Sequence, residues 1–159
     1  MTEASLHLIV RRTIRASPER LFAAWTEPAQ LVQWWGPEGV RCPHAEVDLR
    51  VGGRYRIANE TPEGTVWISG YFERIEPPTE LVYTWTVEPS SRAPERVRVR
   101  FEPRDEGTEV IVVHERIADQ AARDQHEHGW QGCLDGLRRL AEARPTPPDR
   151  SAPQGPGRG

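Results

Sequence analysis

The sequence predicts an α+β fold, in which a curved antiparallel sheet of seven strands lies against a long C-terminal helix. Three observations lead to this prediction. Residues 119–143 carry the only long helical pattern, the segments between residues 45 and 116 alternate apolar and polar residues with a period of two, and two short helical patterns follow a first strand. Because short turns connect the later strands, we expect an antiparallel meander that curls around the final helix.

The C-terminal helix is predicted from one apolar stripe. Its residues recur at spacings of four, three, four and three, and they are His126, Trp130, Cys133, Leu137 and Leu140. This is the pattern of an amphipathic helix with one buried face. Asp119 suits the N-cap, and Pro145 stops the helix after its last periodic residue. Gly129, Gly132 and Gly136 each cost about 0.8–1 kcal/mol relative to Ala, so we expect a neighbouring element to approach the helix closely, above all at Gly129.

The N-terminal segment is predicted to form a strand followed by two short helices. Leu6–Ile14 alternates as a strand, and Arg12 falls on its inward side, where we expect it to pair with a carboxylate at the rim. Ser17 is a suitable N-cap for a helix with Pro18 in its first position. A second short helix is predicted over Ala29–Trp35, before a turn rich in Gly and Pro.

The later strands have a clear inward parity. The residues expected to face the helix are Tyr55, Ile57, Leu81, Tyr83, Trp85, Val97, Val99, Phe101, Val110, Val112 and His114. Between residues 65 and 75, Val66, Ile68 and Phe72 fall on one parity and Trp67 and Tyr71 on the other. The sequence leaves open which way Trp67 and Tyr71 point. The other five tryptophans fall on or beside inward faces, and they are Trp25, Trp34, Trp35, Trp85 and Trp130. As a group they favour a ligand pocket walled by flat apolar rings over ordinary core packing.

Composition and charge exclude several classes of protein. The chain has 159 residues, which suits one domain, and a net charge of −3, which argues against a nucleic-acid-binding surface. No apolar run matches a membrane span and no signal-peptide pattern opens the chain, so we expect a soluble cytoplasmic protein without a membrane partner. The chain contains no lysine, which excludes Schiff-base chemistry and a P-loop nucleotide site.

The cysteines and the C-terminal segment complete the domain prediction. Cys42 and Cys133 are too few for a disulfide framework, and Cys133 is expected to be a buried helix residue. Residues 144–159 are rich in Pro, Gly, Arg and Ser and have almost no apolar side chain. We therefore expect a disordered tail over residues 144–159, after a folded domain over residues 1–143.

Four segments resemble a known family. They are SPERLFAAWTEPAQLVQWWGPEG from residue 17, VGGRYRI from residue 51, GYFERIEPPTELVYTW from residue 70 and HERIADQAARDQHEHGWQGCLDGLRRLAE from residue 114. They resemble bacterial proteins similar to the C-terminal domain of the heat-shock-protein-90 ATPase activator, within the START-like (SRPBCC, helix-grip) superfamily. The resemblance covers about residues 6–143. It implies a helix-grip fold, with the sheet gripping the C-terminal helix over an apolar cavity.

The same resemblance bears on partners. Eukaryotic chaperone activators of this kind carry an additional N-terminal domain, whereas the first strand here begins within about six residues of the start. We therefore expect no chaperone activation, and a chaperone-interaction module is only the third functional hypothesis. The sequence leaves a homodimer open.

The first functional hypothesis is a domain that binds an apolar or aromatic small molecule between sheet and helix, without a cofactor. The residues expected to line its cavity are Phe22, Trp35, Trp85, Val99, Val112, His114, His126 and Trp130. The second is a cyclase or hydrolase acting on a polyketide-like substrate, with His114 or His126 as its acid or base. No motif completes a catalytic set around them. No metal site is predicted. The histidines of His126-Glu127-His128 lie two positions apart and do not share a helix face, and a site from His114, His126 and a carboxylate would need a third ligand that the sequence does not place.

Overall fold

The computed structural model describes residues 6–36, 39–90 and 92–143. In chain order its elements are β1 (Leu6–Ile14), α1 (Pro18–Thr26), α2 (Pro28–Trp34), β2 (Arg41–Val47), β3 (Arg54–Thr61), β4 (Gly64–Glu76), β5 (Glu80–Glu88), β6 (Glu95–Arg104), β7 (Gly107–Ile117) and α3 (Gln120–Glu142). None of the helices in these ranges has the length and hydropathy that a membrane span requires. The predicted tail over residues 144–159, which includes Pro145, lies outside the described residues.

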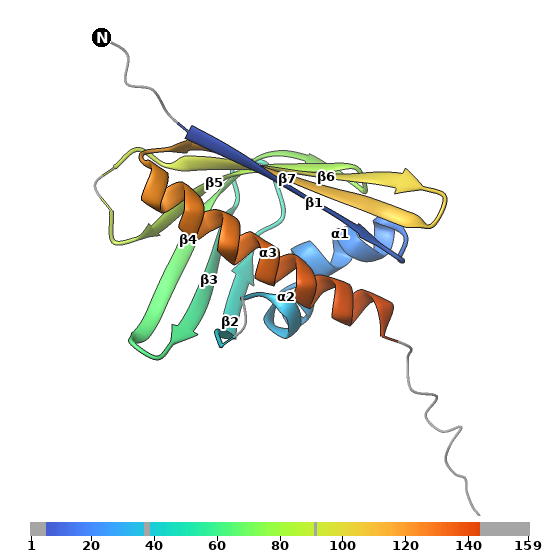
Figure 1. The fold of residues 1–159 in the computed structure, drawn as a ribbon. Coiled ribbons are helices and arrows are strands. Elements are labelled where there is room, and N and C mark those ends of the chain that lie inside the picture. The colour runs from blue at the N-terminus through green and yellow to red at the C-terminus, as the bar shows by residue number, and fades with distance from the viewer. Residues whose placement is uncertain (1–5, 37–38, 91, 144–159) are drawn as a thin grey trace, which may run out of the picture.

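The seven strands form one antiparallel sheet, as predicted. Their order is β1-β7-β6-β5-β4-β3-β2, so every neighbour except the β1–β7 pair is also consecutive in the chain. The first and last strands pair through Val10 opposite Val112 and Ile14 opposite Thr108. Figure 1 shows α3 running diagonally across one face of the curved sheet, with α1 and α2 beside its C-terminal half. The predicted α+β helix-grip architecture is confirmed.

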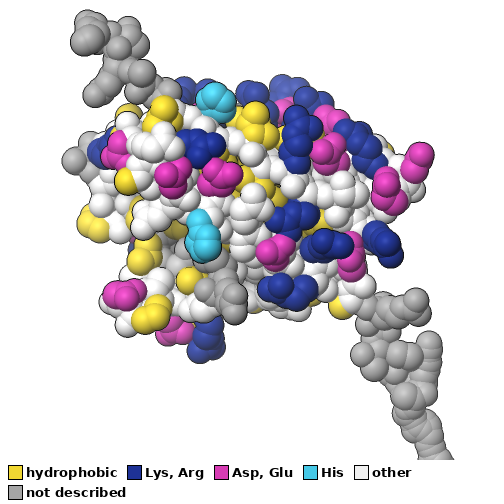
Figure 2. Space-filling model, viewed as in Figure 1, with side chains coloured by type: hydrophobic (Ala, Val, Ile, Leu, Met, Phe, Trp, Pro, Cys, Tyr) yellow, Lys and Arg dark blue, Asp and Glu magenta, His cyan; other side chains and the backbone are white. Residues whose placement is uncertain are grey.

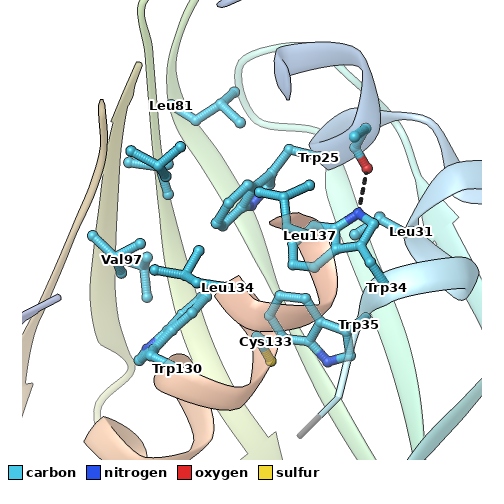
Figure 3. Packing of buried hydrophobic residues seen from close by; sticks show 14 of the residues in the cluster. Trp25, Leu31, Trp34, Trp35, Leu81, Val97, Trp130, Cys133, Leu134 and Leu137 are labelled. Carbon is cyan, nitrogen blue, oxygen red and sulfur yellow. Dashed lines mark hydrogen bonds between the residues drawn. The ribbon is translucent and has the colours of Figure 1, made fainter. Parts of the chain in front are cut away.

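The two short helices form where their caps predict. The Ser17 hydroxyl accepts a hydrogen bond from the backbone N–H of Arg20 at 3.1 Å, and Pro18 begins α1. The second helix begins at Pro28 rather than at the predicted Ala29, because proline needs no N–H partner in a first turn. The two helices are tied together by the Trp34 indole N–H, which donates to the Ala24 carbonyl at 2.9 Å (Figure 3).

The inward parity predicted for β5, β6 and β7 is confirmed. Leu81, Val97, Val99, Val110, Val112 and His114 have no exposed surface. The two residues whose direction the sequence left open both point away from α3. Tyr71 is 54% exposed, and the guanidinium of Arg56 lies 3.8 Å above the ring of Trp67 on the outer face. The outer face therefore has its own cation–π contact, apart from the core.

The helix α3 covers the sheet with the predicted stripe. The Asp119 carboxylate caps it by accepting from the backbone N–H of Ala122 at 2.8 Å. Leu134 and Leu137 have no exposed surface. The inward-facing Arg12 of β1 forms an ion pair with Asp135 of α3, as predicted for a charge at the rim. The guanidinium of Arg12, a group that can form two parallel hydrogen bonds to a carboxylate, thus joins β1 to α3.

The close approach predicted for the helix glycines occurs at Gly136 and not at Gly129. A Cβ added to Gly136 would lie 2.6 Å from the carbonyl oxygen of Trp34, so α2 packs directly on the helix backbone there. A Cβ added to Gly129 would meet no atom within 4 Å. The prediction for Gly129 was therefore wrong. The low helix propensity is a property of glycine itself and does not report whether another element lies against it.

Candidate functional site

Two hollows lie between the sheet and the helices. The inner one measures about 20 Å³, room for about one water molecule, and apolar and aromatic side chains enclose it. The outer one is a groove of about 320 Å³. Its lining residues are Trp35, Val40, Asn59, Thr61, Val66, Ile68, Trp85, Val87, Gln125, His126, Gly129, Trp130 and Cys133. The groove, unlike the inner cavity, has the size typical of a small-molecule site, about 300–1,000 Å³.

The groove lies between the N-terminal half of α3 and strands β3, β4 and β5. Its sheet side is mainly apolar, with Val66 and Ile68 of β4 beside Trp85 of β5. Its helix side is formed around Gly129, whose missing side chain leaves the space open. Helix packing that is tight at Gly136 and open at Gly129 thus creates the groove.

A third hollow of about 600 Å³ lies along α2 and the C-terminal end of α3. Its lining includes Gln33, Arg41 and Arg139, which are solvated surface side chains. Trp35 is the one predicted site residue that borders it. Figure 2 shows basic and acidic side chains interspersed on the face that α3 presents, and pairs such as Arg123 with Glu127 neutralise each other there. Among the described residues of this face there is therefore no broad surface of one charge.

Tryptophans form the wall between the groove and the inner cavity. Trp35 and Trp85 line both hollows, and their rings lie 6.0 Å apart. Trp130 of α3 packs against both of them, at ring-centroid distances of 5.4 and 5.6 Å. Figure 3 shows Trp35 and Trp130 lying near Trp25 and Trp34 around the buried side of α3. A ligand in the groove would therefore contact the aromatic core directly.

Unpaired polar atoms are concentrated at this wall. Within residues 6–36, 39–90 and 92–143, three buried side-chain atoms have no hydrogen-bond partner: Nε1 of Trp35, Nε1 of Trp85 and Oδ1 of Asn59. All three residues line the groove. An unpaired buried polar group costs about 1–3 kcal/mol, and each such group in a folded protein needs a physical explanation.

A polar cluster lies behind one end of the groove. It consists of Glu95 at the start of β6, His114 of β7 and His126 of α3. Oε1 of Glu95 lies 2.7 Å from Nε2 of His114 and 3.1 Å from Nε2 of His126. The two imidazole rings stack with their centroids 4.6 Å apart and their planes 12° from parallel. The two histidines therefore meet, as the sequence suggested, and a carboxylate lies between them.

Hydrogen bonding determines the tautomer of His114. The Trp130 indole N–H donates to Nδ1 of His114 at 3.0 Å. Nδ1 must then be the acceptor, so the proton of the neutral ring lies on Nε2 and is donated to Glu95. Burial lowers the pKa of His114, and the hydrogen bond to Glu95 opposes this only in part. His114 is thus a neutral donor that has both ring nitrogens engaged.

Glu95 is the charged member of the cluster. Burial acts to raise the pKa of its carboxyl group, but hydrogen bonds from His114 and His126 outweigh that effect and lower the pKa to about 2. The carboxylate is therefore ionised at neutral pH. Its side chain is 20% exposed and His126 is 19% exposed, whereas His114 is fully buried.

The same three side chains have the residue types of a metal site, since one ligand atom from each lies within 4.8 Å of the others. Nitrogen and oxygen donors of this kind suit zinc and related ions. The bond from Trp130 opposes metal binding at His114, because Nε2 carries the proton in that tautomer and has no lone pair to offer. The arrangement fits a shared-proton cluster better than a preformed metal site.

Cys133 is the one sulfur nucleophile that lines the groove. The side chain is buried, and its Sγ accepts a hydrogen bond from the backbone N–H of Gly36 at 3.4 Å. Burial raises the pKa of the thiol to about 12, so the thiolate is scarce at neutral pH. Cys133 is thus a buried helix residue, as predicted, and a poor nucleophile.

The predicted site residues fall into two groups. Trp35, Trp85, His126 and Trp130 line the groove, and His114 lies directly behind Trp130. Phe22, Val99 and Val112 lie in the core outside the groove lining, with Phe22 packed edge-on against Phe101. A ligand role for any of these eight residues stays a prediction.

Sequence reasoning missed Glu95. The signal was present, because Glu95 has the same strand parity as Val97, Val99 and Phe101, all of which face inward. An acidic residue at an inward position needs a partner. The same rule predicts a carboxylate partner for Arg12, which also falls on an inward parity.

Comparisons with known proteins place the chain in a family. The family model for the Activator of Hsp90 ATPase homolog 1-like protein matches residues 15–142. A comparison with curated protein sequences finds no significant match. Solved structures that are similar include the AHSA1 protein from Silicibacter pomeroyi, which is 30% identical, has a TM-score of 0.76, and aligns over 85% of this chain and 96% of its own.

Two further structures agree with this assignment. A protein from Chromobacterium violaceum is 26% identical with a TM-score of 0.80, over 87% of this chain and 98% of its own. An AHSA1-like protein from Aeromonas hydrophila is 26% identical with a TM-score of 0.70, over 86% and 92%. With the helix-grip fold and the family match together, the chain belongs to the family of Activator of Hsp90 ATPase homolog 1-like proteins, within the START-like (SRPBCC) superfamily.

Proposed function

We propose that this protein binds a small apolar or aromatic molecule in the groove between α3 and strands β3 to β5. The observation that carries the proposal is the set of three unpaired polar atoms on residues of the groove lining, from Trp35, Trp85 and Asn59. These atoms have almost no accessible surface in the free protein, so the side chains must shift on binding before a ligand oxygen can accept from the indole N–H groups or a ligand hydroxyl or N–H can donate to the amide oxygen. Binding would then recover hydrogen bonds that the free protein leaves unmade.

The rest of the lining supports an apolar ligand body. Val66, Ile68 and Val87 form the sheet side, and the ring of Trp130 forms part of the helix side. Small-molecule sites combine such an apolar lining with a few convergent polar groups. The family description names a chaperone activator, but the groove itself supports a small molecule better than a protein partner.

The proposal is tested by following indole N–H signals in the NMR spectrum of nitrogen-15-labelled protein during titration with 2-naphthol. This probe has a fused aromatic body and one hydroxyl. The signals of Trp35 and Trp85, assigned through Trp35→Phe and Trp85→Phe, are expected to shift with saturation. Trp67 supplies an internal control, because it lies on the outer face beneath Arg56.

Saturable shifts at Trp35 and Trp85, with Trp67 unmoved, would support binding in the groove. Equal small shifts at all the indole signals would indicate weak non-specific contact. That result, or unmoved signals at millimolar 2-naphthol, would contradict the proposal.

A further inference from the structure

His114 connects three elements of the fold through its two ring nitrogens. From β7, its Nε2 lies 2.7 Å from Oε1 of Glu95 on β6, and its Nδ1 accepts from the indole N–H of Trp130 on α3 at 3.0 Å. The bond from Trp130 exists only while Nδ1 keeps its lone pair, which requires a neutral ring. The position of this tryptophan is therefore coupled to the protonation state of one buried histidine.

A second proton can be added to His114 only at Nδ1. Nε2 already carries the proton that is donated to Glu95, so an added proton takes the lone pair that accepts from Trp130. Two N–H groups would then face each other across 3.0 Å. Rotation of the ring gives no relief, because both nitrogens of an imidazolium are donors. Protonation of His114 and the hydrogen bond from Trp130 therefore exclude each other.

The charged groups around His114 act in both directions. Glu95 stabilises an imidazolium at Nε2, and it stays ionised in mild acid because its pKa is lowered to about 2. Glu115, the next residue of β7, also favours the charged ring, whereas a charge on the stacked ring of His126 opposes it. Burial outweighs the carboxylates and lowers the pKa of His114. The ring is therefore neutral at neutral pH and takes up a proton only in acid.

The other strands packed around His114 present side chains that do not titrate: Leu8 of β1, Val97 of β6 and Trp85 of β5.

Trp130 belongs to the wall of the groove. It is buried, lines the groove, and packs against Trp35 and Trp85 at ring-centroid distances of 5.4 and 5.6 Å. Trp25 of α1 stacks on it at 6.0 Å. Within the described part of the chain, its N–H has one hydrogen-bond partner, Nδ1 of His114. Loss of that partner leaves a buried donor unpaired, which is costly, so movement of the indole is favoured. The lining of the groove then changes.

We propose that His114 and Trp130 form a pH-sensitive latch in the wall of the groove. The neutral imidazole holds the indole of Trp130 in place. When the indole moves aside, a proton from solvent can bind Nδ1, and the imidazolium then prevents the indole from returning. Because the groove described above belongs to the neutral state, its ligand is expected to bind more weakly in acid. That effect on binding rests on the proposed function, whereas the latch itself does not.

The latch is tested by NMR of nitrogen-15-labelled protein from about pH 7.5 to about pH 4.5, a range that spans the ordinary pKa of histidine. The indole N–H of Trp130 and the ring nitrogens of His114 are assigned by through-bond correlation to the backbone. Their signals are expected to change together, with one midpoint below about 6.5. The indole N–H of Trp34 is the internal control, because it donates to the backbone carbonyl of Ala24. Far-UV circular dichroism of the same samples follows the folded state.

Two variants should move the midpoint of His114 in opposite directions. Trp130→Phe removes the donor that stabilises the neutral ring, so the midpoint should rise by about 0.5–1 pH unit. Glu95→Gln keeps an oxygen that can accept from Nε2 but lacks the charge, so the midpoint should fall by at least about 0.5 pH unit. The exposed His128→Gln on α3 should leave it unchanged. If Trp130 only fills space, Trp130→Phe would leave the midpoint where it is.

Titration with 2-naphthol tests the effect on binding. Its phenolic hydroxyl stays protonated over this pH range, so any pH dependence comes from the protein. The dissociation constant, from the indole shifts of Trp35 and Trp85, is expected to rise at least about fivefold below the midpoint. By the same linkage, saturating 2-naphthol should lower the midpoint of His114. Trp130→Phe should lose most of this pH dependence.

The outcomes separate the latch from the proposed function. A Trp130 signal that stays unchanged while His114 becomes protonated overturns the latch. A His114 that remains neutral until the protein unfolds also overturns it, because the latch would never open in the folded state. A dissociation constant that is the same on both sides of the midpoint overturns the control of binding by pH. If 2-naphthol binds at no pH, the proposed function fails, and the NMR titration still decides the latch.

Discussion

The two halves of α3 contact the sheet in different ways. In the C-terminal half, Leu134 and Leu137 are fully buried, and α2 lies against the backbone of Gly136. In the N-terminal half, Gly129 faces open space, and His126 borders a groove of about 320 Å³. One amphipathic stripe thus serves two purposes. The packed half anchors the helix, and the other half borders the groove.

The difference between the two halves of α3 shows where this fold tolerates polar groups. Apolar contacts dominate beneath the packed half. Beneath the groove half lie the Glu95 cluster and the unpaired indole N–H groups of Trp35 and Trp85. Binding sites commonly retain polar groups that cost stability, because those groups are used when a ligand is bound. We therefore expect mutations in the two halves to differ in kind.

The largest effect on stability is expected from Leu134→Ala in the packed half. Leu134 has no exposed surface, and its truncation leaves a cavity in the core. The free energy of unfolding should fall by about 2–5 kcal/mol, measured by urea denaturation. The matched change in the groove half is Gln125→Ala, at an exposed lining residue, which should change stability by less than about 0.5 kcal/mol. Equal losses for the two variants would contradict the contrast between the halves.

The next effect concerns acid sensitivity, which we assign to the groove half. The pKa of Glu95 is lowered to about 2 in the folded protein, against about 4.3 in an unfolded chain. Its stabilising contribution is therefore present above about pH 4 and is lost as the pH falls toward 2. At neutral pH, Glu95→Gln should lower the free energy of unfolding by about 1.5–3 kcal/mol, since hydrogen bonds to a charged group are lost.

His114 adds a second loss of stability as the pH falls. Its folded pKa is lowered by burial, so the unfolded chain takes up a proton first as the pH falls below about 6.5, and stability declines from there. Urea denaturation at a series of pH values should show a flatter curve between pH 4 and 2 for Glu95→Gln than for wild type. The exposed Glu106→Gln should retain the wild-type curve, and an unchanged curve in Glu95→Gln would refute the assignment.

A smaller loss is expected from Gly136→Ala. The added Cβ would lie 2.6 Å from the Trp34 carbonyl oxygen, and a backbone atom cannot easily move away. Overpacking of this kind costs about 1–3 kcal/mol and exceeds the gain in helix propensity of about 0.8–1 kcal/mol. Thermal unfolding followed by circular dichroism should show a lower melting temperature, and a higher one would mean that α2 is not seated on the helix.

The smallest effect has the opposite sign. Gly129→Ala adds a Cβ that meets no atom within 4 Å, so the helix-propensity gain of up to about 1 kcal/mol is not offset. The melting temperature should rise slightly. A fall comparable with that of Gly136→Ala would show that the groove closes onto the helix at Gly129.

Much of the fold could be predicted from the sequence, because the spacing of apolar residues along a helix and their alternation along a strand report directly on which side chains are buried. The alternation of Val97, Val99 and Phe101 identified the core side of β6, and the helical stripe placed His126 and Trp130 above it. The limits are equally physical. The sequence contains three glycines in α3, but whether a neighbour or open space faces each one depends on how α2 is seated.

The candidate site was predicted less completely than the fold. Four of the eight residues proposed from sequence line the groove, and their inward direction was the property that the pattern could reveal. Which inward side chains border open space and which fill the core depends on the volume left between α3 and the sheet. Phe22, Val99 and Val112 share the inward direction of Trp85 but lie outside the lining of the groove. The position of a cavity along a helix is a three-dimensional property, so periodicity cannot supply it.

The central claim, that the groove is a binding site, is tested most directly by filling it. Gly129→Leu places a large apolar side chain in the open space of the groove, and Ala121→Leu adds the same side chain at an exposed position of α3. The dissociation constant for 2-naphthol, from the indole shifts of Trp35 and Trp85, should rise at least tenfold in Gly129→Leu, which stays folded, and should be unchanged in Ala121→Leu. Wild-type affinity in a folded Gly129→Leu variant would contradict the claim, because a ligand cannot occupy a space that leucine has filled.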